Sequence, residues 1–113
     1  MWKGVLSSLL VLAASPVLAA APTFPGYAQM PTAADMARLY PDKALDVGKE
    51  GDVVMQCTVQ RDLTLARCAV SSETAEGFGF GDAALQLSKF FRMKKGARPG
   101  SRITIPIQFQ TPG

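Results

Sequence analysis

Two cysteines, the only ones in the chain, end the stretch CTVQRDLTLARC at Cys57 and Cys68. Two thiols can bind a metal, take part in a redox reaction, or form a disulfide bond. A zinc site needs three or four ligands, but the chain has no histidine and no second cysteine pair. A thioredoxin-like redox site needs C-x-x-C at the start of a helix, and that motif is absent as well. We expect a disulfide if the protein is exported to an oxidising compartment. In a reducing compartment we expect two buried thiols that act as small apolar residues.

Alternating apolar and polar residues on both sides of the cysteines predict a β-hairpin. A turn at Asp62-Leu63 makes one face of the hairpin consistently apolar, and directly opposed residues then lie within disulfide reach. The expected pairs are Cys57 with Cys68, Val59 with Ala66, and Met55 with Val70. A leucine with positive φ is costly, so a wider turn over Arg61–Thr64 is the alternative. That turn would make the cysteine pairing diagonal.

The N-terminus has the three parts of a secretory signal peptide. Lys3 precedes an apolar run over Val5–Ala14, and small residues then favour cleavage after Ala19 or after residues 20–21. The alternative is an uncleaved membrane anchor. Residues 5–21 are shorter than the about 20 apolar residues that a span needs, and serines and a proline interrupt them. We therefore expect residues 1–19 to be a cleaved signal peptide, the protein to be periplasmic, and no transmembrane segment to remain.

The stretch GFGFGDAAL has a Gly-x-Gly-x-Gly pattern of the kind that can surround a phosphate. The dinucleotide fingerprint would need glycine where Asp82 stands, and the carboxylate there would repel a phosphate. It would instead stabilise the positive N-terminal end of a helix dipole. The pattern therefore predicts a tight turn that lets Phe78 or Phe80 enter the core.

Catalysis without histidine would need a carboxylate or a lysine as the base. Glu73, Glu76 and Asp82 lie close together in the sequence, beside Ser71-Ser72. Nothing separates these residues from an ordinary solvated loop, so we expect no catalytic residues, no metal site and no cofactor.

The charges are unevenly spread along the chain. Residues 22–88 carry five positive and nine negative side chains, whereas residues 89–113 carry six positive and none negative. This predicts a basic patch, with Phe90 and Phe91 between the first charges. Outside the cytoplasm, anionic lipid or a cell-envelope polymer is a more suitable partner than nucleic acid, and a plain solvated surface is the alternative. The patch residues are Lys89, Arg92, Lys94, Lys95 and Arg98.

The remaining elements follow from periodicity and turn residues. Short helices are expected over 33–39, after the weak capping box Thr32–Asp35, and over 41–48. A longer helix is expected over 82–93, after a loop at 71–81 and before a loop at 94–101. The stretch RITIPIQFQ predicts a last strand with one buried face. Pro106 lacks an N–H and puts this strand at a sheet edge. The sum is a small α+β domain with three antiparallel strands and a helix on one face.

The order of these features resembles the C-terminal domain of the TonB energy-transducer family. The resemblance covers residues 40–110. Its residues are Tyr40-Pro41, Ala44, Gly48 and Gly51 before the hairpin, Ser71-Ser72 after it, Asp82-Ala83-Ala84-Leu85 and Phe91 in the second helix, and Ile105-Pro106-Ile107 with Phe109 at the end.

The resemblance implies a three-stranded antiparallel sheet packed against two helices over residues 40–113, after a Pro-rich lead-in at 20–39. It also implies that the last strand binds the TonB box of outer-membrane receptors by strand addition. Family members that transduce energy have a membrane anchor and a long spacer. Residues 22–39 span at most about 60 Å, so we expect a stand-alone binding module. The alternative is an envelope-associated protein that uses its basic patch. An open edge also permits an edge-paired homodimer. The edge residues are Arg102, Ile103, Thr104, Ile105, Ile107 and Gln108.

Overall fold

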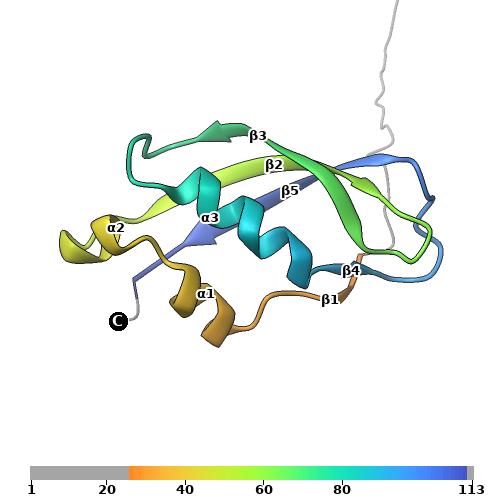
Figure 1. Cartoon of the computed structure of the whole chain (residues 1–113), viewed down its shortest axis with the longest axis horizontal. Coiled ribbons are helices and arrows are strands. Elements are labelled where there is room, and N and C mark those ends of the chain that lie inside the picture. Colours follow the sequence, from red (N-terminus) through yellow and green to blue (C-terminus); the bar gives the residue numbers. More distant parts are fainter. Residues whose placement is uncertain (1–25, 112–113) are drawn as a thin grey trace, which may run out of the picture.

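The computed structural model of the protein describes residues 26–111 (Figure 1). The expected signal peptide and most of the Pro-rich lead-in lie outside the described residues. The elements, in chain order, are β1 (Tyr27–Gln29), α1 (Ala33–Leu39), α2 (Asp42–Asp46), β2 (Gly51–Val59), β3 (Leu65–Glu73), α3 (Phe80–Leu87), the 3-10 helix η1 (Ser88–Phe90), β4 (Arg92–Met93) and β5 (Arg102–Phe109).

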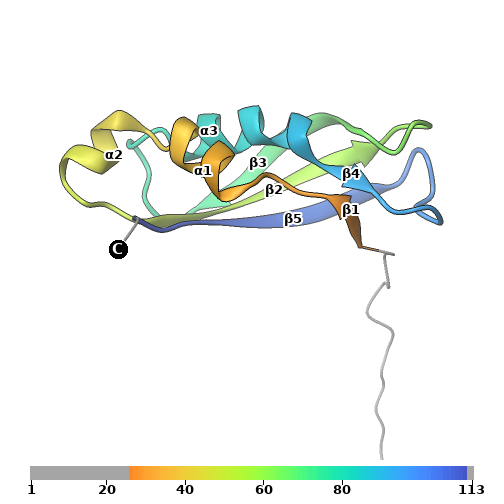
Figure 2. The ribbon, with the colours of Figure 1, turned by 90° about the horizontal axis from the view of Figure 1, so that it is seen from below.

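A three-stranded antiparallel sheet is the main layer, with the strand order β3-β2-β5. The helices lie on one face of this sheet (Figure 2). The prediction of an α+β fold with three antiparallel strands and β5 at an edge is confirmed. A second sheet, in which β1 pairs with β4, was not predicted. In the part of the chain that the structure describes, no helix is long and apolar enough to cross a membrane.

The core forms between the sheet and α3. Every second residue of β2 from Gly51 to Val59 is buried, as the period of a half-buried strand requires. Aromatic rings fill the end of the core near α2: Tyr40 meets both Phe80 and Phe109 edge-on, at 5.6 and 5.9 Å between ring centroids. Phe80 is fully buried and Phe78 only partly, so the glycine-rich stretch does deliver a phenylalanine to the core. Gly77 and Gly79 make that turn with φ near +90°.

The second half of the predicted long helix is wrong. Helix α3 begins earlier, at Phe80, and ends at Leu87; η1 follows, and Arg92–Met93 forms β4. The reason is tertiary: Met93 is fully buried in a second small core, and its N–H donates to the Leu63 carbonyl oxygen at 2.8 Å. The preceding loop is also shorter than predicted, because β3 continues to Glu73.

The hairpin turn combines the two predicted alternatives. Gln60 N–H donates to the Thr64 carbonyl oxygen and Leu63 N–H to the Gln60 carbonyl oxygen, which makes a three-residue loop. Leu63 takes a left-handed φ of 70° even so. The wider loop shifts the register, so Val59 pairs with Leu65 and the predicted pairing with Ala66 is wrong.

One β-bulge in β3 brings the pairing into the predicted register, and a second bulge further along shifts it again. Met55 pairs with Val70, as predicted, and the register shifts on both sides of that pair. One bulge sets Arg67 and Cys68 opposite Cys57, with Arg67 at a φ of 54°. The disulfide Cys57–Cys68 is present, with the Cα atoms 4.0 Å apart, and is confirmed.

The two short helices agree with their predictions. Thr32 Oγ1 accepts the Asp35 N–H, and the Asp35 carboxylate accepts the Thr32 N–H, which completes the capping box of α1. Pro41 is the N-cap of α2, and Gly48 follows that helix with a φ of 65°.

Gly51 is required by close packing. A Cβ atom there would lie 2.9 Å from two ring carbons of Phe80. We expect Gly51→Ala to lower the free energy of unfolding by about 1–3 kcal/mol, as overpacking does. Urea unfolding of the two single variants and of Gly51→Ala/Phe80→Leu checks this. The combined loss should be smaller than the sum of the single losses, and strict additivity would show that the two residues do not clash.

Candidate functional site

The outer edge of β5 presents free backbone groups to solvent. Val59 N–H donates to the Ser101 carbonyl oxygen at 2.9 Å, which fixes the phase of the antiparallel β2–β5 ladder. Hydrogen-bonded pairs recur every second residue. The backbone of Ile103, Ile105 and Ile107 therefore faces β2, and that of Arg102, Thr104, Pro106 and Gln108 faces outward. Pro106 removes one donor from this outward row.

The other edge of the sheet is less suited to pairing. Its strand, β3, carries both bulges, including the left-handed Arg67. Near the hairpin an isolated bridge joins Thr64 to Arg92, so β4 covers that end of β3. Bulges and covering segments are common ways to block an edge. The regular edge of β5 is therefore the one open to strand addition.

An apolar groove lies beside the open edge, on the helix side of the sheet. We call it the edge groove. It consists of two hollows of about 380 and 220 Å³ that share Met36. The larger hollow is lined by Ala33, Met36, Ala37, Tyr40, Leu45 and Gln110. The smaller one is lined by Met30, Pro31, Met36, Phe91, Pro106, Ile107 and Gln108. Charged side chains are absent from both of these linings.

Helix α1 lies on the helix side of the sheet (Figure 2), and residues of α1 and of the segment before it line the outer wall of the edge groove. The Tyr27 ring packs on Phe91, with the ring centroids 5.1 Å apart, and fixes the start of this segment. At the other end, the Tyr40 hydroxyl donates to the Lys49 carbonyl oxygen at 2.6 Å. Burial, and then the Glu50 charge, raise the pKa of Tyr40, so its hydroxyl stays protonated and able to donate. The wall is thus held at both ends.

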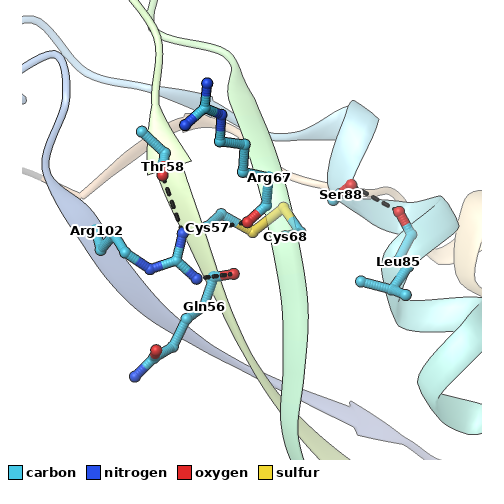
Figure 3. The surroundings of a disulfide bond; sticks show 8 residues. All are labelled: Gln56, Cys57, Thr58, Arg67, Cys68, Leu85, Ser88 and Arg102. Atoms are coloured by element: carbon cyan, nitrogen blue, oxygen red, sulfur yellow. Dashed lines mark hydrogen bonds between the residues drawn. A yellow bond between two sulfur atoms is a disulfide. The ribbon is translucent and has the colours of Figure 1, made fainter.

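Arg102 ties the three strands together at the start of β5 (Figure 3). Its guanidinium donates to Thr58 Oγ1 at 3.0 Å and to the carbonyl oxygens of Arg67 and Gln56, each at 3.2 Å. The Cys57–Cys68 disulfide joins β2 to β3 at the same level, with Cys57 fully buried. The disulfide and Arg102 together hold the hairpin half of the sheet, from which the open edge extends.

The predicted edge residues divide into two sets. The side chains of Ile103 and Ile105 pack in the core, and that of Ile107 packs there while it also lines the smaller hollow of the edge groove. The exposed side chains of Arg102, Thr104 and Gln108 lie on the uncovered face of the sheet. Any recognition at this edge therefore uses the outward backbone row and the edge groove, to which Ile107 contributes.

The sequence reasoning did not find the edge groove. Its lining comes from residues 30–45 and 106–110, and no local pattern connects two segments so far apart. Two signals were present in the chain: Met30 and Leu45 are large apolar residues outside any predicted apolar stripe. They are 54% and 42% exposed in the structure.

The residues of the predicted basic patch lie in different places in the structure. Lys89 stands beside the Phe90 ring, 5.6 Å from its centroid. Arg92 donates to the Asp62 carbonyl oxygen at 3.1 Å, which brings it to the hairpin turn. Lys94, Lys95 and Arg98 lie in the loop between β4 and β5.

The carboxylate and serine candidates are not brought into a reactive arrangement. Ser71 donates its hydroxyl to the Val54 carbonyl oxygen, and the Glu73 carboxylate lies against Gly81 at the start of α3. Within residues 26–111 no group of three or more potential metal ligands comes together.

The sequence matches no known protein-family model, and no curated protein matches it.

The disulfide should contribute to stability mainly by restricting the unfolded chain. It closes a loop with a sequence separation of 11, for which chain entropy gives about 2–3 kcal/mol. We expect reductant to lower the urea midpoint by a corresponding amount. The variant Cys57→Ala/Cys68→Ala is the control, and its midpoint should not respond to reductant. An unchanged midpoint in protein shown to hold two free thiols would contradict this contribution.

Protonation of Asp35 should loosen α1. The Thr32 N–H, and then the Arg38 side chain, hold the pKa of Asp35 below its ordinary value. The cap therefore stabilises α1 fully above the ordinary pKa of aspartate, and its contribution is lost as pH falls through the lowered pKa. Carboxyl ¹³C titration by NMR measures that value. Arg38→Gln should raise the pKa of Asp35, and an unchanged pKa in this variant would show that Arg38 has no part in lowering it.

Proposed function

We propose that this chain is a stand-alone TonB C-terminal-like module that binds an extended peptide segment by strand addition at the edge of β5. The resemblance names the ligand, the TonB box of outer-membrane receptors. The observation that carries the proposal is the open, regular edge of β5 with an apolar groove directly beside it. The chain would serve as a binding protein in receptor-linked transport across the outer membrane, not as an enzyme.

Strand addition has a clear energetic basis here. Among the described residues, no strand pairs with the outward carbonyl and N–H groups of β5, and an incoming peptide would satisfy them with main-chain hydrogen bonds. Such bonds contribute about 0.5–1.5 kcal/mol each, largely independent of peptide sequence. Sequence preference must then come from side chains on the added strand.

The edge groove supplies that preference. Side chains of a strand alternate between its two faces, so every second residue of an added strand would point to the helix side. The two hollows follow one another along β5, near Ile107 and Gln110. From Ile107 to Gln110 is three residues, about 10 Å at the usual rise, which lies between the spacings of residues i and i+2 and of i and i+4, about 7 and 13 Å. The module would thus favour apolar side chains at alternate positions of its ligand.

The proposed location is the periplasm. A disulfide between adjacent strands is typical of oxidising compartments, and the Cys57–Cys68 bond supports this location. The apolar N-terminal stretch with one lysine supports it from the sequence side.

Thr104→Pro tests strand addition directly. The Thr104 N–H faces the open edge, so proline there leaves the β2–β5 ladder intact but removes a donor that an added strand needs. NMR titration with TonB-box peptides, each paired with a scrambled peptide, measures binding. We expect the unmodified protein to show shifts along β5 and in α1. Thr104→Pro should bind at least about 10-fold more weakly, the equivalent of one to two lost hydrogen bonds.

Thr104→Val is the matched control, because it keeps the shape of the side chain and the backbone donor. It should bind like the unmodified protein. Shifts centred on β3, or equal binding by the proline and valine variants, would rule out addition at β5. Absence of binding by any peptide to folded protein would remove the TonB-box assignment.

A further inference from the structure

The fold sorts the charges of the chain to its two ends. One end consists of the hairpin turn, β4 and the following loop, residues 60–64 and 92–101, and we call it the basic end. It holds five cationic side chains and one carboxylate. The cations are Arg61, Arg92, Lys94, Lys95 and Arg98. The basic end lies opposite α2 (Figure 1).

The opposite end is acidic. It consists of α2, the start of β2, and the loop from β3 into α3, and it holds seven of the nine carboxylates against two lysines. Contacts join these segments: the Lys43 ammonium donates to the Gly77 carbonyl oxygen, and Asp52 and Thr74 exchange hydrogen bonds. The net charge of the whole chain, +3, hides this separation.

Among the described residues, the five cations of the basic end are balanced only in part, by the charge of Asp62 acting on Arg92. The one ion pair among residues 26–111 joins Arg38 to Asp35, which both lie in α1 and not in the basic end. The single carboxylate of the basic end, Asp62, accepts hydrogen bonds from Thr64, and these hold the pKa of Asp62 below its ordinary value. The cations therefore repel one another unless an external anion is present.

The segments of the basic end are ordered by packing and by backbone hydrogen bonds. A separate small core of Val59, Met93 and Ala97 lies beneath it. Backbone hydrogen bonds join its segments, from Met93 N–H to Leu63 and from Gly100 N–H to Val59. Packing and hydrogen bonds thus hold in place the backbone that carries these cations.

We propose that the basic end docks the protein on an anionic phospholipid bilayer, with its cations against the phosphate groups. The charges come from the hairpin turn, β4 and the loop rather than from the walls of one pocket. None of the large exposed apolar residues of the described chain, Met30, Leu45 and Val47, belongs to this end. Contact would therefore be electrostatic, without insertion, and sensitive to salt.

Other anionic partners suit this surface less well. Single-stranded nucleic acid is bound through aromatic side chains on which bases stack, and residues 60–64 and 92–101 contain none. Protein partners usually find aromatic anchors in pockets. The lysines and arginines of the basic end are distributed over three segments, without an aromatic residue for stacking or anchoring. Such a surface is suited to the flat and laterally mobile array of phosphates on a bilayer.

Docking at this end would leave the edge groove accessible. The groove involves residues 106–108 of β5, Gln110, α1 and Leu45, toward the acidic end. The nine-residue strand β2 is about 30 Å long at the usual rise, and it connects the two ends. With the basic end on the bilayer and the acidic end repelled from it, the strands would extend away from the membrane. The open edge of β5 would then remain exposed. This inference rests on charge and is independent of the proposed peptide ligand.

Vesicle co-sedimentation tests the docking. Protein secreted to the periplasm of a bacterial host is mixed with vesicles of phosphatidylglycerol and phosphatidylcholine in equal parts, or of phosphatidylcholine alone. We expect binding only to the anionic vesicles, weakening as salt rises. Lys94→Gln/Lys95→Gln should weaken it about 30-fold, since each cation near such a surface contributes about 5-fold.

Lys43→Gln/Lys49→Gln is the matched control, with the same loss of net charge at the acidic end. It should leave vesicle binding unchanged. Equal weakening by both double variants, or salt-independent binding to both kinds of vesicle, would overturn docking through the basic end. Tight binding of a polyglutamate peptide or an RNA oligonucleotide through Lys94 and Lys95, without vesicle binding, would replace the bilayer by an acidic protein or a nucleic acid.

Discussion

Strand β2 is the constraint on which the rest of the structure depends. Its backbone is paired on both sides, with β3 and with β5, and its inward residues are all buried, under the helices or, at Val59, under β4 and the loop that follows it. A three-stranded sheet with such a centre necessarily has two edges. Both would be sites of uncontrolled pairing if neither were protected. The fold treats them differently: bulges and β4 interrupt the edge of β3, whereas β5 stays regular. The functional proposal follows from that asymmetry.

The bulge at Arg67 links the hairpin to the open edge. It sets two residues of β3 opposite Cys57 and turns the Arg67 carbonyl to where the Arg102 guanidinium can reach it. The disulfide holds the same level of the sheet from the core side. A strand that offers its edge to a partner gains affinity when it is already ordered, because less conformational entropy is lost on binding. The disulfide and the Arg102 contacts supply that order at the hairpin half of β5.

What the sequence could predict was set by local signals. Period-two alternation gave the hairpin and β5, the capping box gave α1, and Pro106 gave the edge. The bulges could not be predicted from the alternation of apolar and polar residues. Arg67 and Leu63 adopt positive φ although neither is glycine, and alternation carries no signal for that. Strands β1 and β4, of three and two residues, are too short for any period to be read. Residues after Leu87 keep helical spacing in the sequence, but burial of Met93 in the second core outweighs it.

Features built from distant segments were also missed. The edge groove combines residues 30–45 with 106–110, and the basic end adds Arg61 from the hairpin turn to cations some thirty positions later. The charges are unevenly distributed along the sequence, but only the antiparallel strands bring the hairpin turn and the β4–β5 loop to the same end. Seven of the nine carboxylates gather at the other end for the same topological reason.

Pro106 decides between two uses of the open edge. In a two-fold symmetric pairing of β5 with a second copy, any overlap that includes Pro106 includes it in both strands, so two donors are missing. A foreign strand meets only one missing donor, and each unmade hydrogen bond costs about 0.5–1.5 kcal/mol. Overlap that avoids Pro106 in both copies is confined to the short segments on either side of it, residues 102–105 or 107–109 of β5. The proline thus weakens self-association more than it weakens binding of another chain, and this is what a recognition edge requires.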